Sequence, residues 1–126
     1  MQAVAEREVG LMFWAGGDPR ETLCEVKSLG IRCGQLGVPG EMKLDEAAAA
    51  AWKDALAAEE FRLATVFAAY SGESYADMET VRQTVGFIPR ATREERERRT
   101  YAVSDFAAAL GVCSIACHIG FVPEDP

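Results

Sequence analysis

The first candidate for chemistry in this chain is His118, because it is the only histidine. It follows the apolar run 113–117 and precedes Gly120 by two residues. An imidazole at the end of a buried strand can bind a metal ion through one ring nitrogen, or transfer a proton near neutral pH. A purely structural hydrogen bond suits the same position. The sequence leaves these roles open for His118.

Three further side chains lie near the ends of predicted strands. Trp14 can form an apolar wall for a substrate or pack in the core, and Gln35 can bind a sugar hydroxyl or act as a structural amide. Tyr70 follows the third predicted strand, close to Glu73, a carboxylate for which an exposed loop position is the simpler interpretation. We predict Trp14, Gln35, Tyr70 and His118 as substrate contacts, and His118 also as a metal ligand. We assign no catalytic residue.

Four cysteines offer a second kind of chemistry, and their spacing argues against it. Cys113 and Cys117 are four residues apart on a predicted strand, which separates them by about 13 Å, too far for a disulfide. Cys24 falls on a predicted helix and Cys33 on a different predicted strand. A zinc cluster needs two close pairs of ligands, and only one loose pair exists. We therefore interpret all four as reduced, structural cysteines.

Apolar patterning predicts four strands that alternate with helices. The strands are expected at residues 9–14, 31–36, 62–69 and 113–118, and the helices at 18–30, 45–60, 76–83 and 92–110. Capping boxes at Asp18 and Thr92, each followed three residues later by a glutamate, mark two of the helix starts. Asp45 is expected to cap a third helix, which is rich in alanine.

The order of these elements requires parallel strands joined by right-handed crossovers. An open doubly wound sheet and half of an eight-stranded barrel both satisfy this order. Within 113–118, the even-numbered residues are small or polar, and the odd-numbered residues are apolar. This alternation suits a barrel lumen on one side and a helix layer on the other. We therefore predict a single α/β domain, residues 1–126, with a TIM-barrel-type (βα)4 half-barrel and its helices on the outer face.

Charge and composition narrow the function further. The net charge of −7 argues against nucleic-acid binding, which depends on a basic surface. No apolar stretch approaches the roughly 20 residues that span a bilayer, and residues 1–8 lack the pattern of a secretion signal. We expect a cytoplasmic protein that binds neither nucleic acid nor membrane. The chain also lacks a Gly-rich phosphate loop and a serine nucleophile elbow.

Residues 9–125 resemble the N-terminal half of the sugar phosphate isomerase/epimerase family, the xylose isomerase-like TIM barrels. The resemblance lies in residues 9–14, 34–40, 63–70 and 116–123. It implies a divalent metal (Mn²⁺, Mg²⁺, Co²⁺ or Zn²⁺) at the mouth of a completed barrel, with ligands mostly from later strands. His118 and Gly120 resemble the His-x-Gly of the endonuclease IV-like branch, where that histidine meets metal. The second histidine ligand of that branch has no counterpart here, which argues against a repair nuclease.

The resemblance implies a partial domain that moves a proton between adjacent carbons of a keto or aldo sugar once its barrel is completed. A small sugar or sugar phosphate is the expected substrate. A full barrel takes about 250 residues, and one histidine cannot form a catalytic metal site, so we expect these 126 residues alone to be inactive. Exposed edge strands predict self-association. The alternative is a non-catalytic half-barrel assembly or interaction module.

Overall fold

A computed structural model describes residues 6–124. The predicted domain of residues 1–126, and the resemblance that extends to Asp125, include positions outside these described residues. The strands are β1 (Leu11–Trp14), β2 (Cys33–Val38), β3 (Arg62–Ala68) and β4 (Ile115–Cys117). The helices are α1 (Pro19–Lys27), α2 (Glu46–Ala58), α3 (Met78–Thr84) and α4 (Arg93–Ala109), with a 3₁₀ turn at Arg90–Thr92. None of the described helices has both the length and the apolarity to cross a lipid bilayer.

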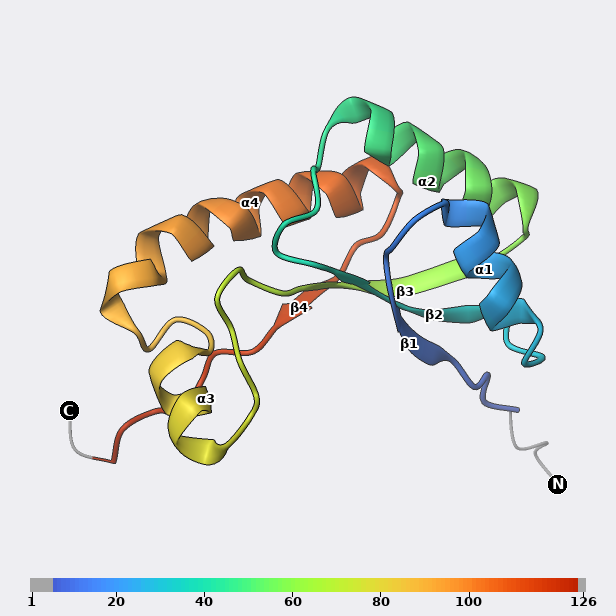
Figure 1. Cartoon of the computed structure of the whole chain (residues 1–126). Helices are drawn as coiled ribbons and strands as arrows, with labels where there is room; N and C mark the ends of the chain where they lie inside the picture. The colour runs from blue at the N-terminus through green and yellow to red at the C-terminus, as the bar shows by residue number, and fades with distance from the viewer. Residues whose placement is uncertain (1–5, 125–126) are drawn as a thin grey trace, which may run out of the picture.

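The strands form one parallel sheet in the order β1-β2-β3-β4. Each strand therefore pairs with its predecessor in the sequence, without the reversal of strand order that defines a doubly wound sheet. Helices α1, α2 and α4 all lie on one side of the sheet (Figure 1). This arrangement confirms the half-barrel and excludes the open doubly wound alternative.

Three aspartates begin the helices by capping them. The side chains of Asp18, Asp45 and Asp77 each accept a hydrogen bond from the backbone N–H three residues later, at 3.0, 2.8 and 2.8 Å. Such caps satisfy N–H groups that have no partner inside the helix. The caps predicted at Asp18 and Asp45 are confirmed, and Asp77 begins the short helix that the sequence predicts near 76–83.

The capping box predicted at Thr92 is wrong. The 3₁₀ turn Arg90–Thr92 precedes α4, so Thr92 is already in a helical conformation (φ −109°, ψ −2°) and makes no side-chain cap. A capping side chain needs an extended backbone to reach the free N–H groups of the first turn. The hydroxyl of Thr92 is instead buried without a protein partner.

Every strand differs by one or two residues from its predicted bounds, and two of these differences affect the candidate site. Strand β2 continues through Gly37 to Val38, although the sequence predicts a loop from Gly37. Gly37 pairs with Trp14 and Phe67, and a Cβ there would lie 2.6 Å from Trp14 Cε3. The glycine thus makes room for the indole inside the sheet. Strand β4 ends at Cys117, so His118 begins the following loop.

The helix-facing side of the sheet carries the core. Phe13, Leu36 and Val66 lie beside one another across β1, β2 and β3, and all are buried. They pack with the helices through Leu23 and Val26 of α1, Trp52 and Ala55 of α2, and Val103, Phe106 and Ala107 of α4. Each large side chain buried in this way contributes about 1.5–3 kcal/mol to folding.

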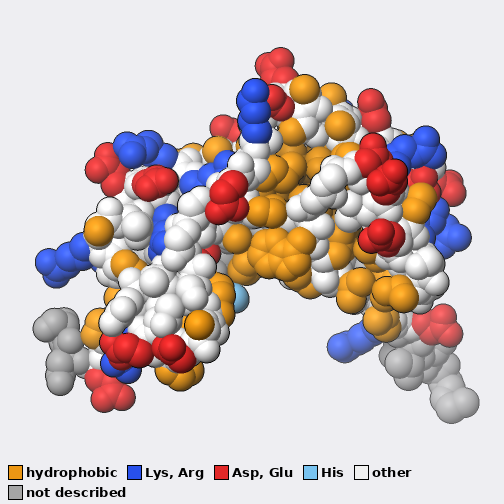
Figure 2. Space-filling view, viewed as in Figure 1, with side chains coloured by type: hydrophobic (Ala, Val, Ile, Leu, Met, Phe, Trp, Pro, Cys, Tyr) orange, Lys and Arg blue, Asp and Glu red, His pale blue; other side chains and the backbone are white. Residues whose placement is uncertain are grey.

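The opposite side of the sheet, here called the open face, has none of the described helices packed against it. Successive strand residues point to opposite sides, so Trp14, Gly37, Phe67 and Ala116 form one row across the four strands. Trp14 is 49% exposed and Met12 is 39% exposed. Figure 2 shows hydrophobic side chains in the hollow between the lobe that carries α3 and the rest of the molecule. In a closed barrel this face would line the lumen.

Candidate functional site

The carboxyl ends of the strands carry four aromatic side chains in a line, here called the aromatic row: Trp14, Phe67, His118 and Tyr75. Trp14 meets Phe67 edge-on at 6.0 Å between ring centroids, and Phe67 meets His118 at 5.0 Å. Tyr75 meets His118 at 5.6 Å. Edge-to-face contacts of this kind hold the rings in defined orientations. The row extends along the open face from β1 to the segment before α3.

The backbone of the sheet explains why these rings meet. Trp14 pairs with Gly37, Gly37 with Phe67, and Phe67 with Ala116. Gly37 has no side chain to separate Trp14 from Phe67, and Ala116 is small. His118 lies two residues beyond Ala116 and so returns to the same face. The row therefore depends on the register of all four strands.

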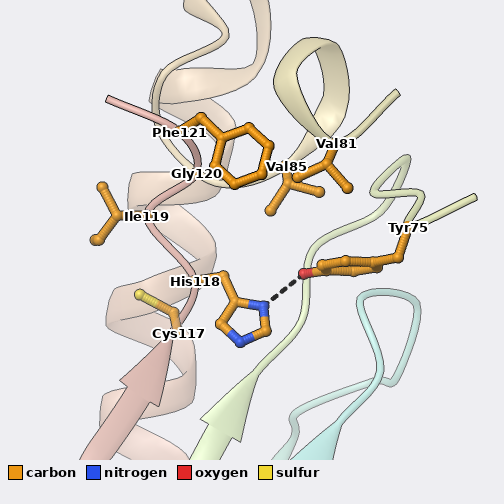
Figure 3. Close-up of a pocket in the computed structure, with 8 residues that line it drawn as sticks. All are labelled: Tyr75, Val81, Val85, Cys117, His118, Ile119, Gly120 and Phe121. Carbon is orange, nitrogen blue, oxygen red and sulfur yellow. Dashed lines mark hydrogen bonds between the residues drawn. The ribbon is translucent and has the colours of Figure 1, made fainter. Parts of the chain in front are cut away.

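Two aromatic neighbours hold the imidazole of His118. Its Nδ1 atom lies 2.7 Å from the hydroxyl of Tyr75, within hydrogen-bond distance. The ring of Phe67 packs against it from β3. Figure 3 shows that the second nitrogen, Nε2, is on the side of the ring that faces away from Val85 and Phe121. His118 itself is exposed. Nε2 is thus the nitrogen available to a ligand on the open face.

Beside His118 lies a pocket of about 430 Å³, within the size range of small-molecule sites. It is lined by Tyr75, Val81, Val85, Cys117, His118, Ile119, Gly120 and Phe121. Tyr75 and His118 contribute the polar ring atoms, whereas the valines, Ile119 and Phe121 form an apolar wall (Figure 3). The pocket can accept a compact group with an apolar surface.

One wall of this pocket is a close crossing of two backbone segments. The N–H of Phe87 donates to the carbonyl of Ile119 at 2.8 Å, which joins the end of α3 to the loop after β4. Gly86 and Gly120 both have positive φ, +74° and +100°. A Cβ on Gly86 would collide with the Ile119 carbonyl, and one on Gly120 with the Val85 carbonyl. Both positions therefore require glycine.

Tyr70, a predicted substrate contact, lies in the core on the helix-facing side. It is 4% exposed, its hydroxyl is 2.6 Å from that of Thr100, and its ring packs against Phe87. The guanidinium of Arg96 lies over the ring at 5.7 Å. Burial raises the pKa of Tyr70 to about 12. The structure gives Tyr70 packing and hydrogen-bonding partners apart from the aromatic row.

Glu73 has a structural position. One carboxylate oxygen accepts from the backbone N–H of Tyr70 at 2.8 Å, and the other accepts from Gly86 at 2.9 Å. Both oxygens therefore hold the loop after β3 against the glycine crossing. This carboxylate positions the pocket wall instead of lining the aromatic row.

Gln35 lies on the open face but away from the carboxyl ends of the strands. It pairs with Met12 and Thr65 in the middle of the sheet, three residues before the end of β2. Of the four predicted contacts, the structure brings Trp14 and His118 into one row, and leaves Gln35 and Tyr70 outside it.

Phe67 and Tyr75 were not predicted from the sequence. Alternation along β3 could have placed Phe67 on the same face as Thr65, because the two are separated by one residue. Tyr75 lies in a loop, where no periodic signal applies. The crossing of the Gly86 and Gly120 backbones holds the loop that carries His118. It joins residues about 34 apart in the sequence, so no local signal predicts it.

The side chains around His118 do not fit a divalent metal on their own. Among residues 6–124, no group of three or more His, Cys, Asp or Glu side chains gathers as a metal site would require. The ring of His118 is instead flanked by Phe67 and Tyr75, and Tyr75 occupies Nδ1. A catalytic site of the zinc type uses about three protein ligands and an open position.

A parallel sheet in sequential strand order with helices on one side is half of a TIM barrel, and its fold matches half of a xylose isomerase-like barrel. The chain is similar to a xylose isomerase domain protein from Planctomyces limnophilus, whose crystal structure matches with a TM-score of 0.83 and 31% sequence identity. The match covers 93% of this chain and 42% of that protein, so the chain spans less than half the length of its relative. The resemblance predicted from the sequence is confirmed at this level. No protein-family model and no curated protein matches the chain.

Proposed function

We propose that this chain is a sugar isomerase/epimerase-like domain and forms part of the substrate-binding mouth of a TIM barrel. The observation that carries the proposal is the aromatic row, because it lies at the carboxyl ends of the strands. TIM-barrel active sites are built at that end. The similarity to a xylose isomerase domain protein supports the same class of substrate.

The aromatic row suits a small sugar or sugar phosphate. The C–H face of a sugar is apolar and packs against the faces and edges of aromatic rings such as Trp14 and Phe67. His118 then reaches a hydroxyl or carbonyl oxygen through its free Nε2 atom. These side chains bind and orient the sugar. Both oxygens of Glu73 accept hydrogen bonds from the backbone, so we propose that the base that moves the proton is not Glu73 and comes from the complementary half of the barrel.

Completion of the barrel is part of the proposal. In the family that the chain resembles, a divalent metal polarises the carbonyl and hydroxyl oxygens of the sugar. We propose that the carboxylates for this metal come from a complementary half-barrel, because residues 6–124 do not gather them. We also propose a cytoplasmic location, supported by four cysteines that form no disulfide.

Two measurements test this proposal. A polypeptide of these 126 residues is expected to show no turnover of keto or aldo sugars, or of their phosphates, with added Mn²⁺, Mg²⁺, Co²⁺ or Zn²⁺. A chimera that joins the chain to the unmatched part of the Planctomyces limnophilus protein is expected to bind sugars and turn one over. Robust turnover by the 126 residues alone would contradict the proposal that a complementary half-barrel supplies the metal ligands and the base.

Variants of the chimera assign the site. Removal of the imidazole in His118→Ala is expected to lower kcat/KM about tenfold, which corresponds to the loss of about one hydrogen bond to the sugar. Tyr101→Ala is the matched aromatic control, because Tyr101 is 64% exposed and lies on α4. A folded chimera that binds no sugar, or in which the two variants behave alike, would refute the proposed function.

A second candidate function is a non-catalytic half-barrel assembly module. The exposed open face and the two free sheet edges, β1 and β4, favour it. In this case two copies of the chain close an eight-stranded barrel, and the aromatic row contributes to packing instead of binding a sugar.

A further inference from the structure

The hydrogen bond between Tyr75 and His118 determines which ring nitrogen holds the proton. A neutral imidazole has one nitrogen that donates and one that accepts. Nδ1 of His118 is 2.7 Å from the Tyr75 hydroxyl, and Nε2 faces the open side of the ring (Figure 3). The direction of this one hydrogen bond therefore decides what Nε2 can offer a ligand.

The chemistry of the two groups favours Tyr75 as the donor. A phenol is a stronger donor than acceptor, since its oxygen lone pair is delocalised into the ring, and an imidazole nitrogen is a strong acceptor. The ordinary pKa of a tyrosine hydroxyl is about 10, so the hydroxyl keeps its proton at neutral pH. If Tyr75 donates to Nδ1, the neutral imidazole must carry its proton on Nε2.

Packing keeps the imidazole in this orientation. The rings of Phe67 and Tyr75 meet it edge-on at centroid distances of 5.0 and 5.6 Å. The segment that carries His118 is in turn held to the end of α3 by the bond between Phe87 and Ile119. A ring flip that exchanged the two nitrogens would break the hydrogen bond to Tyr75.

We propose that Tyr75 is a positioning residue that holds His118 as the Nε2–H tautomer, so that the imidazole donates a hydrogen bond to a ligand oxygen instead of binding a metal ion through Nε2. A metal ligand must present a lone pair, which this tautomer lacks at Nε2. The identification of the ligand oxygen as that of a sugar rests on the proposed function, whereas the tautomer does not.

The single histidine allows a direct test. Long-range ¹H–¹⁵N spectra of the tag-free, ¹⁵N-labelled chain are recorded near pH 8, well above the ordinary histidine pKa of about 6.5. We expect a protonated-type signal at Nε2 and an unprotonated, hydrogen-bonded signal at Nδ1. A protonated Nδ1, or a signal averaged between the two forms, would overturn the proposal.

Two variants separate the hydrogen bond from the fold. In Tyr75→Phe the ring remains but the hydroxyl is lost, so the Nδ1 signal is expected to move toward that of an unbonded imidazole nitrogen. Tyr101→Phe, which removes an exposed hydroxyl on α4, is expected to leave both nitrogen signals unchanged. Circular dichroism checks that both variants fold. An unchanged Nδ1 signal in Tyr75→Phe would show that Tyr75 does not position the ring.

Zinc tests the alternative role of His118. One equivalent of Zn²⁺ is added, and the Nε2 signal of His118 is followed. Zinc bound to cysteines elsewhere in the chain would leave this signal unchanged. The proposal expects Nε2 to keep its proton. Loss of that proton with a metal-induced shift would make His118 a metal ligand. If the Nε2–H tautomer is observed but the chimera binds no sugar, the proposed function is wrong and the role of Tyr75 stands. If the chimera binds a sugar but the Nε2–H tautomer is not observed, only the role of Tyr75 is wrong.

Discussion

At the scale of single residues, two glycines shape one wall of the pocket beside His118. Gly86 and Gly120 contact each other's segments where the end of α3 meets the loop after β4, and that loop carries His118. Any side chain at either position would separate the two backbones. The imidazole and Tyr75 would then no longer be held at hydrogen-bond distance. Residues without a side chain thus control the geometry of the site.

Gly86→Ala is expected to lower the free energy of unfolding more than Gly111→Ala does. The two glycines have almost the same backbone conformation, φ +74° and +75°, which costs an alanine about 1–2 kcal/mol. A Cβ at Gly111 meets open space, whereas one at Gly86 collides with the Ile119 carbonyl. The difference between the variants in urea denaturation measures the collision. Equal losses of unfolding free energy in the two variants would show that the Gly86 and Ile119 segments can move apart at no cost.

At the scale of elements, α1 and α2 are joined by one carboxylate. Glu59, at the end of α2, accepts from Arg20 and Lys27 of α1 at 3.0 Å each. Lys27 and Arg20, in that order, lower the pKa of Glu59 below its ordinary value of 4.5. These two ion pairs help to fix the two helices relative to each other.

The lowered pKa of Glu59 predicts a pH dependence of stability. Its contribution is fully present above about pH 4.5 and is lost as the pH falls through the lower pKa of the folded state. Glu59→Gln is expected to be less stable than the unaltered chain at pH 7, and this difference is expected to shrink toward pH 3. Denaturant titrations at several pH values measure it.

Glu94→Gln provides the comparison, because Glu94 forms an exposed pair with Arg98 within α4 alone. Exposed pairs of this kind contribute little to stability. If Glu94→Gln lowers the free energy of unfolding at pH 7 as much as Glu59→Gln does, the ion pairs between α1 and α2 stabilise the fold no more than an exposed pair. A difference that grows toward pH 3 would contradict the sign of the pKa shift.

At the scale of the whole molecule, the open face and the two sheet edges are without partners in the described chain. Strand β1 pairs only with β2, and β4 only with β3. A twofold axis along the barrel axis would place β4 of one copy beside β1 of the other, in parallel, and would bury Met12 and Trp14. Free edges of this kind favour pairing with another chain.

The assembly module predicts a dimer that forms as the protein concentration rises. Light scattering after size exclusion is expected to give twice the mass of one chain, more completely at high salt because each copy carries a net charge of −7. Met12→Lys, on the open face, is expected to restore the monomer, whereas Tyr101→Lys on α4 is not. A strict monomer at high concentration would rule out closure by a second copy.

Much of the fold could be predicted because its signals are local. Asp18 and Asp45 cap their helices through contacts three residues away, and Gly30 and Gly111 end α1 and α4 with positive φ. Short apolar runs predicted the strands, and the order of elements required parallel pairing. Thr92 failed as a cap because it is the last residue of a 3₁₀ turn, so its backbone is helical instead of extended.

The candidate site could be predicted only in part, because it depends on contacts between distant residues. By itself, the sequence determined the half-barrel, the resemblance to xylose isomerase-like barrels and the place of His118 at the end of the last strand. Only the tertiary structure decided that Tyr70 is buried, that Gln35 lies in mid-strand, and that Phe67 and Tyr75 flank the imidazole. Strand register and a crossing of two glycine backbones bring those rings together, and neither is encoded by neighbours along the chain.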